Sequence, residues 1–332
     1  MAHNITHLDS FLMGNALADI LVPVPEDEFL SLGIERGEST LTSAQEQLEL
    51  LLKLDSFSKT VASGGSAVNS SKVMAQLGAN VAACGKVGDD KYGELFLADL
   101  SAVKVTTGNP FVIQGPTGTS VVLVTPDSER SMRVALGAAA KLGPDDIDPQ
   151  AVRVAKWLFV EGYLLGNGSA CQEAVLKAVR SAEQYGVPVA ISLSSKTTIR
   201  AHRSLMEQLL DAADLVIGNS SEANELTGAD TWQDSFDIIR DKGKAALISS
   251  GPHGAFVGYG ALRHAHVPAF KTEIVDLTGA GDALAGGFLY GITHGLDPVK
   301  AARLGCEISS KVISHLGAGL RQDEIPDLAP YR

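Results

Sequence analysis

The chain has 332 residues and a mass of 34.7 kDa, enough for one large α/β domain, alone or with a small subdomain. Its 45% hydrophobic and 20% charged residues are close to globular averages, which excludes global disorder. The 27 basic and 39 acidic residues give a net charge of −12, which argues against a nucleic-acid partner because such proteins normally carry a basic face. The 34 glycines, with only 5% aromatic residues, favour an enzyme whose strand-to-helix turns approach a small ligand closely.

The cysteines and the N-terminus indicate the compartment. Cys84, Cys171 and Cys306 are far apart and form no Cys-x-x-Cys or Cys/His cluster, so we expect buried free thiols. The first 22 residues lack the basic region and apolar core of a secretion signal. No run approaches the roughly 18 apolar residues of a membrane span. We therefore expect a cytoplasmic protein without a membrane partner.

The first part of the chain predicts a mixture of strands and helices. Residues 11–22 are expected to form a strand, a Gly-Asn turn and a second strand that ends near two prolines. Residues 43–54 have helical spacing, and Ser43 with Glu46 makes a capping-box pattern at their start. The next elements are expected to be a helix at 66–77, a buried strand at 81–87, a helix at 92–100 and a strand at 117–125.

From about residue 144 the pattern becomes a regular alternation of short apolar strands and amphipathic helices. The strands are expected at 157–160, 187–192, 215–217 and 245–249, and the helices between them at 171–185, 204–213 and 232–242. Such alternation predicts right-handed βαβ units and a parallel sheet. The segments 23–42 and 105–135 do not fit that sheet, and we interpret them as a small second layer or lid on a single domain that spans 1–332.

The strongest candidate for chemistry is the segment 276–282, DLTGAGD, which precedes a helix of small residues. Gly279 and Gly281 flank Ala280 and let backbone N–H groups converge at the helix N-terminus, which suits a phosphate or the charge that develops in phosphoryl transfer. Asp282 beside such an anion hole would repel a bound phosphate. We interpret it as a general base that accepts the proton of an attacking hydroxyl; the alternative is a helix-capping residue.

Two common nucleotide-binding patterns are missing. No Gly-x-x-x-x-Gly-Lys-Ser/Thr sequence occurs, which excludes a Walker-type phosphate loop. A dinucleotide fingerprint that starts at Gly279 fails at Leu284, where Gly or Ala belongs, and its strand comes late in the chain. The failed fingerprint and the late position of its strand disfavour a dehydrogenase.

Two N-terminal segments are suited to a polar ligand. Gly64 and Gly65 open a helix, and Asn69 lies one turn later on it, although a tight turn before a helix gives the same residues. Asp19 lies in an otherwise apolar strand, where a carboxylate is costly to bury without partners. Paired sugar hydroxyls would satisfy it, as would solvent at the strand end.

Two later segments are suited to a nucleotide and its metal. Asn219 and Glu222 follow a predicted strand and could order the water shell of Mg²⁺, or they could be turn residues before a helix. Ser249, Gly251 and Gly254 stand at another strand end, where they could approach phosphates or only turn the chain.

In this order and spacing, these segments resemble the ribokinase-like (PfkB) carbohydrate kinase family over essentially the whole chain. Residues 276–287, DLTGAGDALAGG, are similar to its C-terminal signature, and residues 64–85 are similar to its N-terminal one. Asn219 and Glu222 match its Asn-x-x-Glu magnesium motif. Residues 249–254 match its Thr-x-Gly-x-x-Gly nucleotide turn, with Ser in place of Thr.

The resemblance implies a central, mostly parallel sheet flanked by helices, with a small β-rich lid. It also implies an ATP-dependent kinase that phosphorylates a hydroxymethyl group of a sugar or sugar-containing substrate. Asp282 would be the base, and Gly279, Ala280 and Gly281 would form the anion hole. The residues implied to bind substrate are Asn15, Asp19, Gly64, Gly65 and Asn69. The residues implied to bind ATP are Asn219, Glu222, Ser249, Gly251, Gly254 and Gly281, with Asn219 and Glu222 holding Mg²⁺ through water.

Some features of the family carry over less directly. The positions of Asp276 and Thr278 help to form a monovalent-cation loop in some relatives, which implies a K⁺ site. Leu277 replaces a usual Thr, which puts that site in doubt, and Leu284 replaces a usual Phe, which we interpret as a packing change. The lid often supplies a dimer contact in this family, which implies a homodimer.

The expected substrate is an adenosine-like nucleoside. Residues 14–20 and 64–70 look more like adenosine kinases than like ribokinase, which usually has Lys-Gly where this chain has Ser66 and Ala67. Residues 129–139 are similar to the return from lid to core in nucleoside kinases. Arg130 in that stretch could neutralise the transferring phosphate or be a solvated surface residue.

Residues after the strand at 157–160 leave the alternatives open. Tyr163 could stack on a base, whereas Glu161 suits additional sugar hydroxyls better than a purine face. The alternative substrate is a free sugar or sugar acid of the ribose, fructose or 2-keto-3-deoxygluconate type. A non-catalytic binding or regulatory protein on this fold is a third hypothesis, disfavoured because a pure binder does not need Asp282 beside the Gly-Ala-Gly turn.

Overall fold

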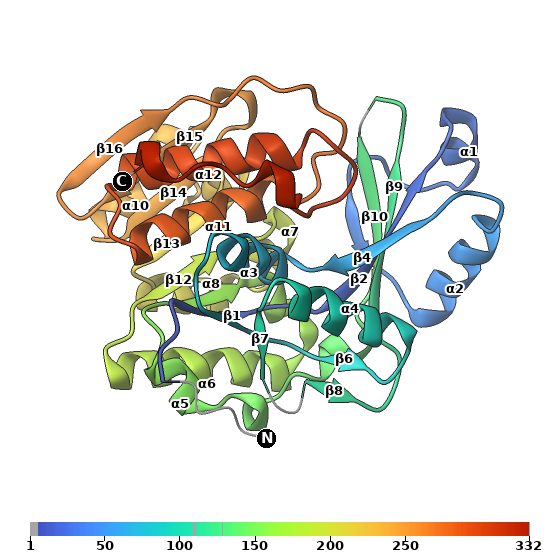
Figure 1. Ribbon diagram of the computed structural model, residues 1–332, viewed down its shortest axis with the longest axis horizontal. Coiled ribbons are helices and arrows are strands. Elements are labelled where there is room, and N and C mark those ends of the chain that lie inside the picture. The colour runs from blue at the N-terminus through green and yellow to red at the C-terminus, as the bar shows by residue number, and fades with distance from the viewer. Residues whose placement is uncertain (1–5, 109–110, 128, 332) are drawn as a thin grey trace.

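The computed structural model describes residues 6–108, 111–127 and 129–331, and it places two β-sheets side by side (Figure 1). The larger sheet has nine strands in the order β16-β15-β14-β13-β12-β11-β1-β5-β7. Their bounds are β1 Ser10–Met13, β5 Val81–Cys84, β7 Thr106–Thr107, β11 Leu158–Glu161, β12 Val189–Ser192, β13 Leu215–Asn219, β14 Ala245–Ser249, β15 Ala255–Tyr259 and β16 Leu262–Val267. All neighbours run parallel except β14–β15 and β15–β16. The expected parallel sheet is therefore confirmed.

Helices cover both faces of the large sheet, because successive strand residues point to opposite sides. Leu12 of β1 packs into one apolar cluster, and Phe11 and Met13 pack into the other. The helices on the Leu12 side are α3 Ser66–Gln76, α4 Lys91–Ala102, α11 Ala280–Thr293 and α12 Pro298–Val312. Those on the other side are α5 Pro149–Arg153, α6 Ser169–Tyr185, α7 Lys196–Ala201, α8 Arg203–Ala212, α9 Ser220–Thr227 and α10 Trp232–Asp241. Burial on both faces explains why these strands are continuous apolar runs.

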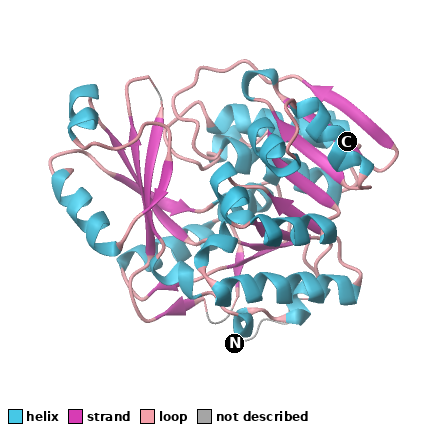
Figure 2. Cartoon of the chain, turned by 180° about the vertical axis from the view of Figure 1, so that it is seen from behind, coloured by secondary structure: helices cyan, strands magenta, loops and turns pink. Residues whose placement is uncertain are grey.

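The smaller sheet has five strands in the order β3-β10-β9-β2-β4 and a core of its own. Its strands are β2 Leu17–Pro23, β3 Ser39–Leu41, β4 Thr60–Gly64, β9 Gly118–Val124 and β10 Arg130–Ala135. The helices α1 (Glu26–Ser31) and α2 (Ala44–Lys53) lie against it, on the side away from the large sheet (Figures 1 and 2). A separate two-stranded ladder pairs β6 (Val87–Gly88) with β8 (Val112–Ile113). The fold is thus a large α/β body with a small β layer beside it.

The local predictions agree with this structure in most places. Helix α2 begins after Ser43, and the reciprocal hydrogen bonds of its capping box with Glu46 are present. The three cysteines are buried free thiols. Within the described part of the chain, no helix has the length and apolarity needed to cross a membrane.

The boundaries of the small layer differ from those predicted. The segments 23–42 and 105–135 supply β3, β9, β10 and α1, but β2, β4 and α2 lie outside them, and β7 belongs to the large sheet. Strand β2 is almost entirely buried and apolar, which is why its sequence resembles a strand of the central sheet. Only three residues separate it from β1, so the chain leaves one sheet for the other at this turn.

The packing of α11 on α12 predicts a stability effect. A side chain at Gly287 would place its Cβ 2.7 Å from Gly305 Cα, so Gly287→Val should lower the free energy of unfolding by about 1–3 kcal/mol through overpacking. Gly281→Ala is the matched control, because no heavy atom lies within 4 Å of a Cβ there. Urea denaturation of both variants measures the difference. Equal stabilities would contradict this account of the helix pair.

Candidate active site

Most of the predicted site residues gather at the carboxyl edge of the large sheet. Asn15 follows β1, Glu161 ends β11, Asn219 ends β13 and Ser249 ends β14. Parallel strands bring their carboxyl ends to one edge, which is where open α/β sheets bind ligands. In register, Asn219 is the direct neighbour of Ser249, so two segments that are 30 residues apart in sequence lie together.

The loop at residues 276–279, which is braced by hydrogen bonds to Asp276, leads into α11. Asp276 is fully buried, and its Oδ1 accepts hydrogen bonds from Thr278 N at 2.9 Å and Thr278 Oγ1 at 2.6 Å. Its Oδ2 accepts a hydrogen bond from Gly317 N at 2.8 Å. Gly279, the N-cap residue, has φ +79°, which side chains rarely adopt, and a Cβ there would lie 2.5 Å from Ala318 Cβ. The loop therefore fixes the direction in which the helix N-terminus points.

Asp282 is the third residue of α11, and it is held from α3. Asn69 Nδ2 donates to its Oδ2 at 2.9 Å, and Ser70 Oγ donates to its backbone oxygen at 3.0 Å. Although the side chain keeps some solvent contact, burial raises the pKa of Asp282, while hydrogen bonds from Asn69 and Ser66 and the charge of Arg130 act the other way. A carboxyl with a raised pKa is a stronger proton acceptor once it is ionised.

The turn before Asp282 has the properties expected of an anion hole. Within the described residues, no acceptor faces the backbone N–H groups of Gly281 and Asp282. The N–H of Ala280 makes only a long bond of 3.3 Å to Leu277 O. Since no heavy atom lies within 4 Å of a Cβ at Gly281, space is open beside these donors. Helix N-termini with free N–H groups bind anions.

A second carboxylate, Asp19, faces the same place from the small sheet. It is only 8% exposed, and none of the described residues donates a hydrogen bond to its carboxylate. Gly64 on the neighbouring strand β4 leaves room for it, since a Cβ there would lie 2.1 Å from Asp19 Oδ2. Burial raises the pKa of Asp19 to about 7, and the charge of Asp282 adds to this, whereas Lys72 lowers it. Gly65 follows as the N-cap residue of α3.

Two further polar groups in this region are buried without a partner. Asn69 donates to Asp282, but its own Oδ1 has no donor, and Nη1 of Arg130 has no acceptor. Such orphaned groups each cost free energy, and they are typical of a site that a ligand completes. Arg130 begins β10 in the small sheet, yet its charge acts on Asp282 in the large body. The predicted substrate residues thus come from both sheets.

Glu161 lies beneath the site rather than on its surface. It is 1% exposed; its Oε2 accepts from Ala67 N at 2.9 Å, and its Oε1 accepts from Asn15 Nδ2 at 3.2 Å. Asn167 Nδ2 donates to Asn15 Oδ1 at 2.7 Å. Burial raises the pKa of Glu161 to about 7 despite these bonds. Because only 1% of Glu161 is exposed, little of its carboxylate is open to a hydroxyl ligand, and its hydrogen bonds hold Asn15 and the first turn of α3.

Tyr163 lies just beyond the end of β11, half-buried. Its backbone N–H donates to Ser194 Oγ at 3.2 Å, and Ser194, two residues beyond the neighbouring strand β12, has an unusual φ of +68°. Burial raises the pKa of Tyr163, and the nearby charges of Glu222 and Glu161 add to this. The ring therefore stands among the charged groups of the site.

Asn219 and Glu222 are locked together at the start of α9. Asn219 Oδ1 accepts from Glu222 N at 2.9 Å, and Asn219 Nδ2 donates to Glu222 Oε1 at 2.8 Å. Burial raises the pKa of Glu222 to about 7. The two residues therefore cap the helix, and their remaining oxygen lone pairs still suit water molecules around a hard cation. Beyond Ser249, the turn that contains Gly251 and Gly254 follows directly.

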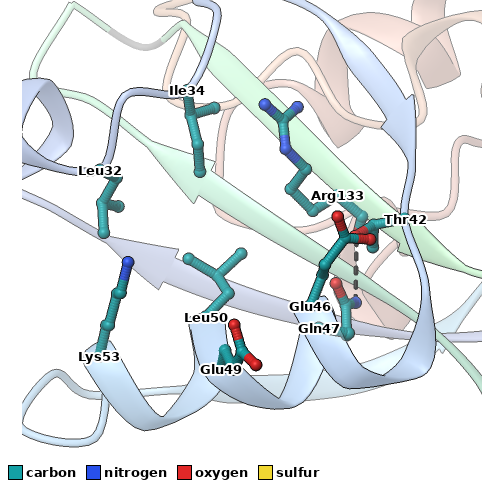
Figure 3. A pocket seen from close by; sticks show the side chains of 9 residues that line it. All are labelled: Leu32, Ile34, Thr42, Glu46, Gln47, Glu49, Leu50, Lys53 and Arg133. Carbon is teal, nitrogen blue, oxygen red and sulfur yellow. Dashed lines mark hydrogen bonds between the residues drawn. The ribbon is translucent and has the colours of Figure 1, made fainter.

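The cavity shown in Figure 3 is a different place. It has a volume of about 220 Å³ and lies between α2 and β10, on the small sheet. Its lining includes Leu32, Glu46, Leu50, Lys53 and Arg133, and none of the predicted site residues. It is therefore separate from the site around Asp282.

Sequence reasoning missed three residues that the structure brings to the site. Lys72 faces Asp19 and Asp282, and Asn167 contacts Asn15. Ser66 bonds to Asp282. Lys72 lies one helical turn after Asn69, so helical spacing gave a signal for it, whereas Asn167 lies in a 3₁₀ turn that no periodic pattern marks.

Comparison with known proteins identifies the class to which this geometry belongs. The sequence profile of the pfkB family carbohydrate kinase matches residues 40–325, and the chain belongs to this family. Kinases of this family phosphorylate sugars or nucleosides, so the protein is a sugar or nucleoside kinase with ATP as co-substrate.

Individual relatives include kinases of both substrate classes. A probable sugar kinase from Rhizobium etli CFN 42 is 32% identical with a TM-score of 0.90, over 97% of each chain. The adenosine kinase from Sinorhizobium meliloti is 33% identical with a TM-score of 0.87, over 94% of this chain and 95% of that one. A 5-dehydro-2-deoxygluconokinase from Shouchella clausii is 30% identical over 78% of this chain and 82% of its own length. These likenesses confirm the ribokinase-like fold.

The burial of Asp19 predicts that the free energy of unfolding depends on pH. Its pKa rises from 3.8 to about 7 on folding, so the folded protein holds this proton more tightly than the unfolded chain. The free energy of unfolding therefore falls as the pH rises through this window, and the loss is complete above about 7. Asp19→Asn removes the charge and should stabilise the protein at about pH 8 by about 1–4 kcal/mol.

The measurement is urea denaturation of Asp19→Asn and the wild type at about pH 5 and about pH 8. The increase in the free energy of unfolding that Asp19→Asn gives should be smaller at about pH 5 than at about pH 8. An equal difference between the two proteins at both pH values would contradict the assignment of a buried, unpaired Asp19.

Proposed function

We propose that this kinase transfers the γ-phosphate of ATP to a primary hydroxyl of a nucleoside, with Asp282 as the general base. The observation that carries the proposal is the position of Asp282. Its carboxylate is held by Asn69, and it stands beside backbone N–H groups that have no protein acceptor. A base and an anion hole at one helix N-terminus are what attack on a phosphate requires.

In the proposed reaction, the acceptor hydroxyl gives its proton to Asp282 as its oxygen bonds to the γ-phosphorus and the bond to ADP breaks. The N–H groups of Gly279, Ala280 and Gly281 would face the negative charge on the transferring group, with Ala280 giving up its long bond to Leu277 O. The orphaned Nη1 of Arg130 offers a further donor from the small sheet. Because Asp282 must be ionised to act, its raised pKa places the rise of activity above the range of an ordinary aspartate.

We propose that the acceptor binds between the small sheet and α3. Asp19 and the orphaned Oδ1 of Asn69 would accept hydrogen bonds from its hydroxyls, beside Gly64 and Gly65. Asn15 would complete this set, positioned by Glu161 from below. With the acceptor bound, the small sheet would act as a lid that excludes water.

ATP is proposed to bind at the ends of β13 and β14, on Ser249, Gly251 and Gly254. Asn219 and Glu222 would hold Mg²⁺ through water, since the carboxylate oxygens of Glu222 each accept one hydrogen bond in the capping box and keep a further lone pair for a water molecule. When bound, Mg²⁺ neutralises phosphate charge. A K⁺ site at Asp276 and Thr278 stays a prediction; Oδ2 of Asp276 accepts one hydrogen bond, from Gly317 N, and keeps a lone pair that a cation could use.

Two observations support a nucleoside as the acceptor. The adenosine kinase from Sinorhizobium meliloti is similar over nearly the whole chain. In addition, the half-buried ring of Tyr163 stands within the charged site, where a base could stack on it. A free sugar or sugar acid is the second candidate, favoured by the density of carboxylate and amide groups around Asp19 and by the similarity to 5-dehydro-2-deoxygluconokinase.

Replacement of the base should abolish turnover while sparing binding. Asp282→Asn should lower kcat by about 10²–10⁴-fold, because a general base contributes that much, and leave acceptor affinity within a few fold. ADP release and calorimetry measure the two quantities. More than about a tenth of wild-type kcat in this variant would overturn the assignment. A wild type that binds ATP but turns over no acceptor would support the non-catalytic alternative.

A substrate panel with variants of Tyr163 separates the two acceptor classes. The panel holds adenosine, inosine, guanosine, ribose, fructose and 2-keto-3-deoxygluconate. We expect a nucleoside to be preferred, and Tyr163→Leu to raise its KM about tenfold while Tyr163→Phe, which keeps the ring, changes it little. Turnover of sugars alone, with both variants like the wild type, would contradict the nucleoside proposal.

A further inference from the structure

Two side chains of the large body, Asp99 and Lys72, form hydrogen bonds with Ser63. It belongs to β4, which is an edge strand of the small sheet. Its backbone N–H donates to Asp99 Oδ2 of α4 at 2.9 Å. Lys72 Nζ of α3 donates to Ser63 O at 2.8 Å and to Ser63 Oγ at 3.0 Å. Polar groups of an edge strand that would otherwise lack a partner are thus paired with the other part of the molecule.

Ser63, which Asp99 and Lys72 hold in place, lies next to the acceptor site. Ser63 directly precedes Gly64, whose backbone packs against the carboxylate of Asp19. Any shift of Ser63 therefore moves the wall against which Asp19 lies. Since Lys72 is on α3 together with Asn69, the same helix that holds the base also holds this edge of the small sheet.

The ammonium group of Lys72 also interacts with the carboxylates around the acceptor site. Its ammonium faces Asp19 on β2, Asp99 on α4 and Asp282 on α11, and burial lowers its pKa. Asp19 in turn faces Asp282 and Asp276, both of which disfavour its ionised form, so Lys72 is the cation that opposes them. None of these carboxylates forms a contact ion pair with Lys72 among the described residues, so the charges act through space.

We propose that Lys72 is a positioning residue for the acceptor site, which pins Ser63 so that Gly64 and Asp19 keep their places and which offsets the negative charge of Asp19. The inference rests on the proposed function, because it takes Asp19 as a ligand of the acceptor. Lys72 does not touch the reacting atoms, and its effect is on acceptor binding rather than on proton transfer.

The first test needs no substrate. Hydrogen exchange of residues 60–65 in the full-length protein should be about tenfold faster in Lys72→Met than in the wild type, because the edge strand loses its anchor. Lys72→Arg keeps a donor and the charge and should restore most of the protection. Lys53→Met, which removes a lysine from the end of α2, is the matched control and should change nothing at 60–65. Unchanged hydrogen exchange of residues 60–65 in Lys72→Met would overturn the proposal that Lys72 anchors Ser63.

The second test is kinetic. Lys72→Met should raise the acceptor KM about tenfold while kcat at about pH 8.5 and the KM for ATP stay within about threefold, the size expected for a lost bond to a charged group. The rise should be larger at about pH 6, because Asp19 protonates more readily without the lysine. Ser63→Ala keeps the cation and should show no such pH effect. Faster exchange with an unchanged acceptor KM would overturn the positioning role.

The two tests distinguish this inference from the proposed function. If Asp282→Asn loses turnover while the Lys72 variants match the wild type, only the inference fails. If the wild type turns over no acceptor, the proposed function fails, and hydrogen exchange still decides whether Lys72 anchors Ser63. If Lys72→Met does not fold, Lys72→Gln, which also removes the ammonium, gives the same comparison with Lys72→Arg.

Discussion

The hydrogen bond from Asn69 to Asp282 joins two helix starts that are 213 residues apart in sequence. It forms only because α3 and α11 pack at very short range: a Cβ at Gly286 would lie 2.7 Å from Ser70 O. Close packing of the helices thus sets the position of Asp282, the proposed base, and the loop braced by Asp276 sets the direction of the helix that carries it. The N–H groups at the start of α11, the small sheet and the ends of β13 and β14 are arranged around this contact.

The site concentrates negative charge in a region that water only partly reaches. Burial raises the pKa of four carboxyls, Asp19, Glu161, Glu222 and Asp282. Each costs stability when ionised. The compensating groups are few: Lys72 and Arg130 supply positive charge, and backbone N–H groups supply dipoles. A phosphorylated nucleotide with its cation and a polyhydroxyl acceptor would pair with the groups that lack a partner among the described residues, which are Asp19, Oδ1 of Asn69 and Nη1 of Arg130.

Sequence patterns predicted the local elements well and their assembly less well. Helical spacing and the Ser43–Glu46 box located α2, and the alternation after residue 144 indicated the parallel sheet, because both depend on short-range periodicity. The assignment of β2 to the small sheet escaped prediction, since its buried residues look the same in either sheet. The role of Glu161 escaped it too, because only the folded chain shows that Ala67 and Asn15 occupy its oxygens. For Asn219 and Glu222, the capping box confirms the helix-cap interpretation, and the magnesium interpretation stays a prediction.

The central claim is that Asn69 serves the reaction by holding Asp282, and a double-mutant cycle tests it most directly. The kcat for ATP-dependent phosphorylation of the preferred acceptor is measured for Asn69→Leu, Asp282→Asn and the double variant. If Asn69 acts through the base, the double variant should retain a kcat within about threefold of Asp282→Asn alone. Losses that multiply in the double variant would show that the two residues act independently, and would contradict the account.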